Sequence, residues 1–232
     1  MNVKLEYEET QNFIIQSISV IGTFNDFDPN KGKMLKEDGK WIFQCSLLPG
    51  EYHYKFLING EIKLNDPLAN LYYPDSNEEL WSVLIINEEG KRLYNNEEYS
   101  LHIGNYNMTS NIYEEIMPIN KKEFNVMLDK KVVMCFEFKE VTGLHSVTVV
   151  WFTPQGKVYE VAEANLFTPE GEEENPIKMW FWLDLNETIT SNNYGMWLVK
   201  LFIDGQYILE DVFSLGTAST YSASGKYSLI NN

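Results

Sequence analysis

The feature that most constrains the fold is a period-two alternation of apolar and polar residues, repeated along much of the chain. It is clear in Trp41–Leu47, Tyr52–Ile58 and Trp197–Ile203. Period two places successive side chains on opposite faces of a strand, and no long stretch keeps a helical period. Dipeptides that favour tight turns separate these runs, among them Asp38-Gly39, Asn59-Gly60 and Asp204-Gly205. Short strands joined by such turns are typical of antiparallel sandwiches, so we predict an all-β fold.

The strand signals form two sets, separated by the polar stretch of residues 88–124. A chain of 232 residues has room for two domains of about a hundred residues each. We therefore predict two immunoglobulin-like β-sandwich domains in tandem. The first is expected over residues 1–91, followed by a linker and the start of the second domain over 92–124. The rest of the second domain is expected over 125–232, including a tail rich in Ser and Thr after Gly216.

Composition excludes several classes of partner. The chain carries 34 acidic and 18 basic residues, for a formal charge of −16. Such a surface repels phosphate backbones, so nucleic acid is not expected to bind. The amino terminus lacks a secretory pattern, and no apolar run is long enough to span a membrane, so no membrane association is expected. Cys45 and Cys135 lie far apart in apolar strand patterns, and we expect them to be two small buried hydrophobic residues in a reducing, cytoplasmic setting.

Motifs for catalysis are not found. The three histidines, His53, His102 and His145, have no metal-ligand spacing. The sequence has no nucleophile elbow and no glycine-rich phosphate loop. With so many acidic residues some pair will meet any distance rule, so their number does not indicate glycoside hydrolysis. We expect neither an enzyme nor a bound cofactor.

An ordered series of motifs runs through residues 12–88. Its members are Gly22-Thr23-Phe24-Asn25-Asp26-Phe27, Asp38-Gly39-Lys40-Trp41, Leu48-Pro49-Gly50-Glu51-Tyr52, Ile58-Asn59-Gly60-Glu61 and Asn65-Asp66-Pro67. Their joint order and spacing resemble the glycogen-binding domain of AMP-activated protein kinase β subunits. They also resemble the related modules that precede the catalytic domains of starch-branching and debranching enzymes. The resemblance implies a small, early-set immunoglobulin-like sandwich that holds α-glucan on one exposed face.

The same resemblance implies a set of sugar-binding positions: Phe27, Lys55, Ile62, Trp81 and Ser82. Phe27 stands where the family has its first platform tryptophan, and its smaller ring can still stack. Lys55 matches the family's sugar-contacting lysine, and the alternation places it off the core-facing row. Ile62 stands where the second platform tryptophan would be, and Trp81 is either a replacement platform or a core or interdomain residue. Ser82 lies in a stretch where binding members often carry Thr and Asn contacts.

The second half, from about residue 125, resembles a generic immunoglobulin or fibronectin-type accessory domain. Trp151 and Trp197 are predicted to lie in its core. Trp180 and Trp182 share the face of their strand opposite Met179, Phe181 and Leu183, where they either bind sugar or a protein partner or pack against the neighbouring domain or a second copy of the chain.

Two functions stay open at this point. One is a non-catalytic protein that binds or targets α-glucan, with Phe27 and Lys55 at the contact. The other is a structural or interaction scaffold that has lost sugar affinity and binds a protein partner or a second copy of itself. The first predicts that Phe27, Lys55 and either Ile62 or Trp81 converge on one exposed face.

Overall fold

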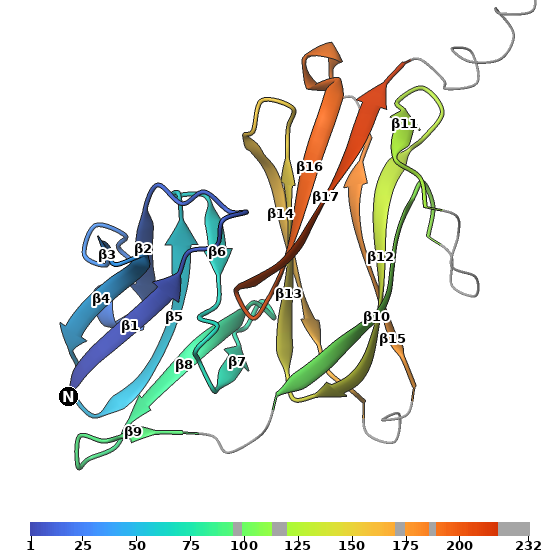
Figure 1. Ribbon diagram of the computed structural model, residues 1–232. Helices are drawn as coiled ribbons and strands as arrows, with labels where there is room; N and C mark the ends of the chain where they lie inside the picture. Colours follow the sequence, from blue (N-terminus) through green and yellow to red (C-terminus); the bar gives the residue numbers. More distant parts are fainter. Residues whose placement is uncertain (95–98, 113–119, 170–174, 186–188, 218–232) are drawn as a thin grey trace, which may run out of the picture.

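The computed structural model describes residues 1–94, 99–112, 120–169, 175–185 and 189–217. Their strands form four sheets, arranged as two sandwiches side by side (Figure 1). The all-β prediction is confirmed. Two single turns of 3-10 helix, η1 (Thr23–Asn25) and η2 (Ser191–Asn193), are the helical elements of the described residues. None of these residues forms a helix long and apolar enough to cross a membrane.

The first sandwich consists of two sheets. One has the order β1 (Asn2–Glu8), β4 (Lys40–Ser46), β3 (Leu35–Glu37). The other has the order β2 (Ile18–Gly22), β5 (Gly50–Ile58), β8 (Leu80–Ile86), β7 (Tyr72–Pro74), with β6 (Ile62–Leu64) paired to β5 and β9 (Arg92–Leu93) paired to β8. The alternation in β5 turns Tyr54, Phe56 and Ile58 into the core, where all three are fully buried. Trp41 packs in the same core.

The second sandwich repeats this plan with longer strands. One sheet has the order β10 (Ser100–Thr109), β12 (Lys131–Thr142), β15 (Ile177–Asp184). The other has the order β11 (Glu123–Asn125), β17 (Gln206–Gly216), β16 (Gly195–Ile203), β13 (His145–Phe152), β14 (Val158–Leu166). Trp151 and Trp197 are fully buried in the core between these sheets, which confirms that prediction. Trp182 is 42% exposed, and its ring lies 4.9 Å from the Lys131 ammonium.

Strand pairing is informative about where the boundary between the two domains lies. Strand β9 pairs with β8 of the first sandwich, and β10 pairs with β12 of the second. The division after residue 91 stays a prediction, and these pairings support a proposed boundary slightly later, between Leu93 and Ser100. The tail beyond residue 217 lies outside the described residues.

The two sandwiches share an apolar interface. Val150 and Phe202 point away from the core of the second sandwich, and both are fully buried because they join the core cluster of the first. The Phe13 and Phe202 rings meet edge to face, with centroids 5.0 Å apart. Burying a side chain of this size is worth about 1.5–3 kcal/mol. Strand β13 and residues 199–203 of β16 are therefore buried on both faces.

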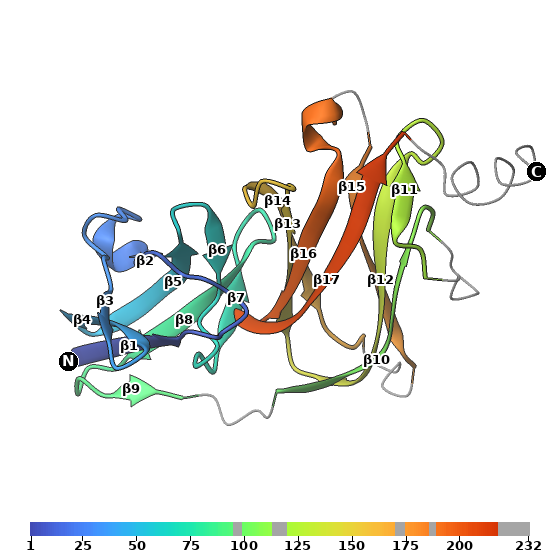
Figure 2. The ribbon, with the colours of Figure 1, turned by 45° about the horizontal axis from the view of Figure 1, so that its top comes forward.

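The turn between β16 and β17 also contacts the first sandwich (Figure 2). The Tyr7 hydroxyl donates a hydrogen bond of 2.9 Å to the Gly205 carbonyl. Gly205 has φ +82°, and a Cβ there would lie 1.8 Å from the Asn65 carbonyl oxygen. Only glycine allows both this backbone conformation and this close approach.

Candidate functional site

Phe27 is placed by a tight turn after β2. The Gly22 amide donates to Asn25 Oδ1 at 3.0 Å, and Asn25 Nδ2 donates to the Val20 carbonyl at 2.8 Å. The Phe27 amide closes the turn on the Gly22 carbonyl at 3.0 Å. A Cβ on Gly22 would lie 2.5 Å from the His53 carbonyl oxygen, so the turn can pass over β5 only with glycine there. The motif Gly-Thr-Phe-Asn-Asp-Phe thus encodes the position of its last aromatic residue.

The backbone of Phe27 is strained. Asp26 and Phe27 both have φ +56°, in the left-handed region. Aspartate tolerates this conformation, but for a bulky residue it costs about 1–2 kcal/mol. The Phe27 side chain is nevertheless 47% exposed, so burial does not compensate fully for the strain.

Phe27 belongs to a group of rings on the outer face of sheet β2-β5-β8-β7. Its ring lies 5.4 Å from that of Trp81, edge to face. Tyr73, the cross-strand partner of Trp81, is 58% exposed, and its ring lies 5.8 Å from that of His53. We call Phe27, His53, Tyr73 and Trp81 the aromatic surface.

Hydrogen-bond acceptors border this surface. Asp75 Oδ2 accepts from the Trp81 indole at 3.3 Å. The backbone N–H of Asn77 is the main cause that lowers the pKa of Asp75, and the Glu79 N–H and the Trp81 indole add to it. Glu51 Oε1 lies 2.7 Å from His53 Nε2. Both carboxylates could accept hydrogen bonds from a ligand's hydroxyl groups.

Lys55 differs from its expected setting. It does lie off the core of its own sandwich, and its Nζ is 5.4 Å from the Trp81 ring, but its side chain has no exposed surface. Glu163, on β14 of the second sandwich, binds the ammonium at 2.7 and 3.0 Å, and Glu79 binds it at 3.0 Å. These contacts use its three donors. The sequence pattern and the family resemblance predicted that Lys55 is exposed beside the sugar. In the structure the second sandwich covers this lysine.

Ile62 and Ser82 do not reach the outer face. Ile62 is 1% exposed and packs in the core of the first sandwich. Ser82 is fully buried: its hydroxyl accepts from the Asp66 amide at 2.8 Å and donates to Asn65 Oδ1 at 3.1 Å. The structure therefore brings together Phe27, Lys55 and Trp81 but leaves only Phe27 substantially exposed, since Trp81 is 8% exposed.

Sequence reasoning missed two neighbours of Trp81. Tyr73 shares its face, and Lys63 Nζ lies 5.8 Å from its ring with a side chain 48% exposed. The signal for Tyr73 was the short apolar run before Asp75, in which alternation turns Tyr72 inward and Tyr73 outward. Lys63 directly follows Ile62, so it occupies the outward position next to the one expected to hold the second platform.

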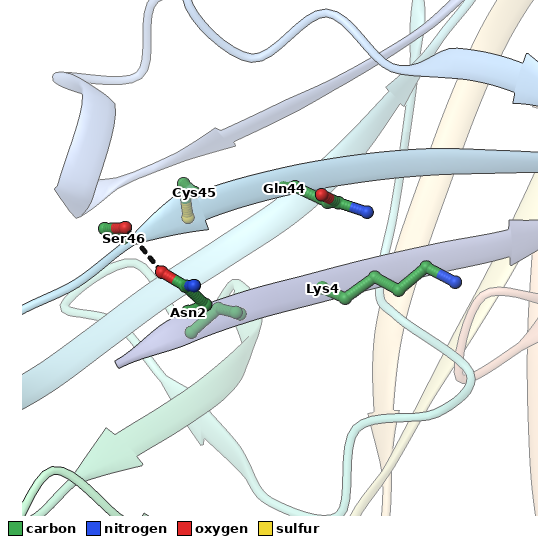
Figure 3. Close-up of a pocket in the computed structure, with 6 residues that line it drawn as sticks. Asn2, Lys4, Gln44, Cys45 and Ser46 are labelled. Carbon is green, nitrogen blue, oxygen red and sulfur yellow. Dashed lines mark hydrogen bonds between the residues drawn. The ribbon is translucent and has the colours of Figure 1, made fainter.

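A separate hollow of about 590 Å³ lies on sheet β1-β4-β3, on the far side of the same sandwich (Figure 3). Asn2, Lys4, Gln44 and Ser46 line it, and the Ser46 hydroxyl donates to Asn2 Oδ1 at 2.7 Å. This lining contains no aromatic ring and so offers no stacking platform. Among the described residues no cluster of His, Cys, Asp or Glu could hold a metal ion.

Comparison with known families agrees with the geometry of the first sandwich. Residues 5–91 match the family model of the glycogen recognition site of AMP-activated protein kinase. The match confirms the resemblance inferred from the motif order, and it covers the aromatic surface in full. No curated protein sequence matches the chain.

Several solved structures are similar to the chain at low identity. An immunoglobulin-like protein from Pseudomonas aeruginosa is 15% identical over 50% of this chain and 97% of its own, with a TM-score of 0.34. A maltogenic amylase from S. marinus is 16% identical over 92% of this chain and 28% of its own, with a TM-score of 0.33. A β-glucosidase from Listeria innocua is 13% identical over 55% of this chain and 17% of its own, with a TM-score of 0.32.

Proposed function

We propose that the chain is a non-catalytic α-glucan-binding protein that uses the aromatic surface of its first sandwich. The observation that carries the proposal is the exposed Phe27 ring set against Trp81, inside the segment that matches the glycogen recognition model. A sugar ring has an apolar face of C–H groups that stacks on an aromatic side chain, while nearby polar groups bind its hydroxyls. Phe27 and Tyr73 supply exposed rings, and Asp75 and Glu51 supply acceptors.

Strain at Phe27 supports a functional role for this residue. A turn under no other demand would be more stable with Asn or Gly at φ +56°. Strained positions cluster at ligand-binding sites because the strain is tolerated where the side chain is needed. A large apolar residue that is half exposed and strained is therefore better explained by stacking on a ligand than by folding.

Lys55, Ile62 and Ser82 have no direct role in this proposal, since all are buried. The contact set that we propose is Phe27 and Tyr73, with the edge of Trp81 and the Lys63 ammonium beside them. Lys63 takes the part of an exposed cation that the resemblance gave to Lys55.

The proposal is tested by measuring binding of the full chain to glycogen, amylose and β-cyclodextrin. Phe27→Ala should weaken β-cyclodextrin binding about tenfold, the value of one lost stacking contact of about 1.4 kcal/mol. Phe167→Ala is the matched control, because Phe167 is also an exposed phenylalanine, at 54%, but lies in the second sandwich. Equal effects of the two variants, or no saturable binding at millimolar concentration, would refute the proposal.

A scaffold function is the second candidate, and one observation favours it. Glu163 of the second sandwich binds Lys55, which has no exposed surface, as expected if this part of the outer face now serves packing between the sandwiches. If the chain is a scaffold, it binds no sugar, so Phe27→Ala has no sugar affinity to reduce. The chain then binds a protein partner or a second copy of itself. Sedimentation of the purified chain over a concentration series distinguishes self-association from a monomer.

The cellular setting forms part of the proposal. Neither Cys45 nor Cys135 forms a disulfide, and burial raises the pKa of each thiol. Two poorly reactive cysteines outside any disulfide agree with a reducing compartment such as the cytoplasm.

A further inference from the structure

Two adjacent cavities lie along the junction of the sandwiches, away from the aromatic surface. One, of about 260 Å³, is lined by Tyr7, Leu68 and Tyr207 among others. The other, of about 330 Å³, is lined by Tyr72, Tyr99 and Ile208 among others. Both include Pro67 and Gln206 in their lining, so they adjoin each other at these residues. We call the two together the interface groove.

Its walls are held by contacts that cross the junction. The Tyr7 hydroxyl binds the Gly205 carbonyl, and Gly205 packs directly on Asn65, so the turn before Gln206 is fixed against the first sandwich. The Tyr72 hydroxyl donates to the Asp66 carbonyl at 3.0 Å, which fixes the loop that carries Pro67. The groove is thus formed before any ligand arrives, as most small-ligand sites are.

The charged groups of the groove are already paired. His145 lies 2.6 Å from Asp204, and Lys40 lies 4.0 Å from Glu8. Glu6 forms an ion pair with Lys4. Because each charge has a partner of opposite sign, the lining offers no free charge to an ionic ligand. The net charge of −16 disfavours an anion further.

Two tyrosine rings and a neutral amide also line the cavities. The Tyr99 ring meets Tyr72 and His145 edge to face, and the Tyr207 ring meets Phe202 edge to face. Tyr99 and Tyr207 are both partly exposed, one in each cavity. The Gln206 side chain lies where the cavities meet, is exposed, and makes no hydrogen bond to any residue that the structure describes. Rings on both sides of a free amide suit a neutral ligand with apolar faces and many hydroxyl groups.

We propose that the interface groove is a second saccharide site, which takes a short linear oligosaccharide between the two sandwiches. The choice of α-linked glucose as the sugar rests on the proposed function, whereas the groove and its neutral chemistry do not. In this site Gln206 binds hydroxyl groups, and Tyr99 and Tyr207 stack on sugar rings. Strands of both sandwiches contribute to it, so it exists only when they are packed together.

Calorimetric titration of the full chain with maltotriose and with β-cyclodextrin separates this site from the aromatic surface. β-Cyclodextrin is a closed ring that suits an open surface, whereas maltotriose is short and linear and suits a groove. Gln206→Ala should weaken maltotriose binding about five- to tenfold, the value of a lost hydrogen bond, and leave cyclodextrin binding unchanged. Phe27→Ala should weaken cyclodextrin binding, and in this variant maltotriose should still bind and still move the backbone amide signal of Gln206, so failure of one site does not hide the other.

Gln44→Ala is the matched control, since Gln44 is also an exposed strand glutamine but lines the hollow of Figure 3. Backbone amide shifts of the unmodified chain give a second measurement: maltotriose should move the signals of Gln206 and Leu68. The proposal is overturned if maltotriose shows no saturable binding up to on the order of 10 mM, if it leaves those amides unmoved, or if Gln206→Ala and Gln44→Ala behave alike.

Discussion

Glu163→Gln provides the most direct test of how the two sandwiches are joined. The Lys55 side chain has no exposed surface, and Glu163 supplies two of its three contacts, at 2.7 and 3.0 Å. The substitution keeps the shape and one hydrogen-bonding oxygen but removes the charge. It leaves a buried ammonium with only Glu79, at 3.0 Å, to balance it.

The magnitude follows from the burial of the lysine. Removing one partner of a buried ion pair costs about 3–5 kcal/mol, because the remaining charge stays in a medium that solvates it poorly. Glu79 remains, and Glu163 itself is 17% exposed, so we expect the lower end, about 3 kcal/mol. In a chain of 232 residues this corresponds to a fall in Tm of about 6–12 °C.

The assay is urea unfolding followed by tryptophan fluorescence, with Glu160→Gln as the control. Glu160 is on the same strand, β14, but exposed, so its substitution should change the free energy of unfolding by less than about 0.5 kcal/mol. The double variant Lys55→Met, Glu163→Leu removes both charges and should recover much of the loss. If Glu163→Gln costs less than about 1 kcal/mol, or if the double variant is as unstable as the sum of its parts, the argument from a buried ion pair is wrong.

Two further predictions concern the junction. Burial opposes charging of His145, but the hydrogen bond and charge of Asp204 outweigh it and raise the pKa of His145 above its ordinary value of about 6.5. The stability from this pair is therefore complete below about pH 6.5 and is lost as the pH rises through the raised pKa. The free energy of unfolding in urea should be lower at about pH 8.5 than at about pH 5.5. Asp204→Asn should make this difference smaller. Gly205→Ala should lower the free energy of unfolding by more than about 2 kcal/mol, because its Cβ would meet the Asn65 carbonyl at 1.8 Å. Gly60→Ala, with φ +75° and open space around it, should cost about 1 kcal/mol, and equal losses would contradict the steric argument.

Much of the fold could be predicted because alternation and turn chemistry are local. The turns Asn59-Gly60 and Asp204-Gly205 both have positive φ at both residues, as such dipeptides favour. Trp41, Trp151 and Trp197 entered the two cores because their strand neighbours on the same face are apolar. In these places the sequence within ten residues determines the structure.

The candidate site could be predicted only in part, because alternation separates two faces of a strand without saying what covers each. It turned Lys55 away from the core, but only the packing of β14 determines that Glu163, far away in the sequence, meets it there. Tyr73 also points outward because side chains alternate along its strand, but this strand has three residues, too few for the alternation to be recognised in the sequence. Phe27 was found because its turn is encoded by the residues just before it.

Two buried lysines connect these observations to the arrangement of the whole chain. Lys55 meets Glu163 across the junction, and Lys200, 5% exposed, binds Glu210 of its own sandwich and the Asn12 carbonyl of the other. Apolar contacts alone tolerate small shifts, whereas a buried ammonium is stable only where its partners align with it. We infer that these lysines fix the position of one sandwich against the other. The interface groove depends on that position and the exposed part of the aromatic surface does not, so Glu163→Gln should weaken maltotriose binding more than β-cyclodextrin binding.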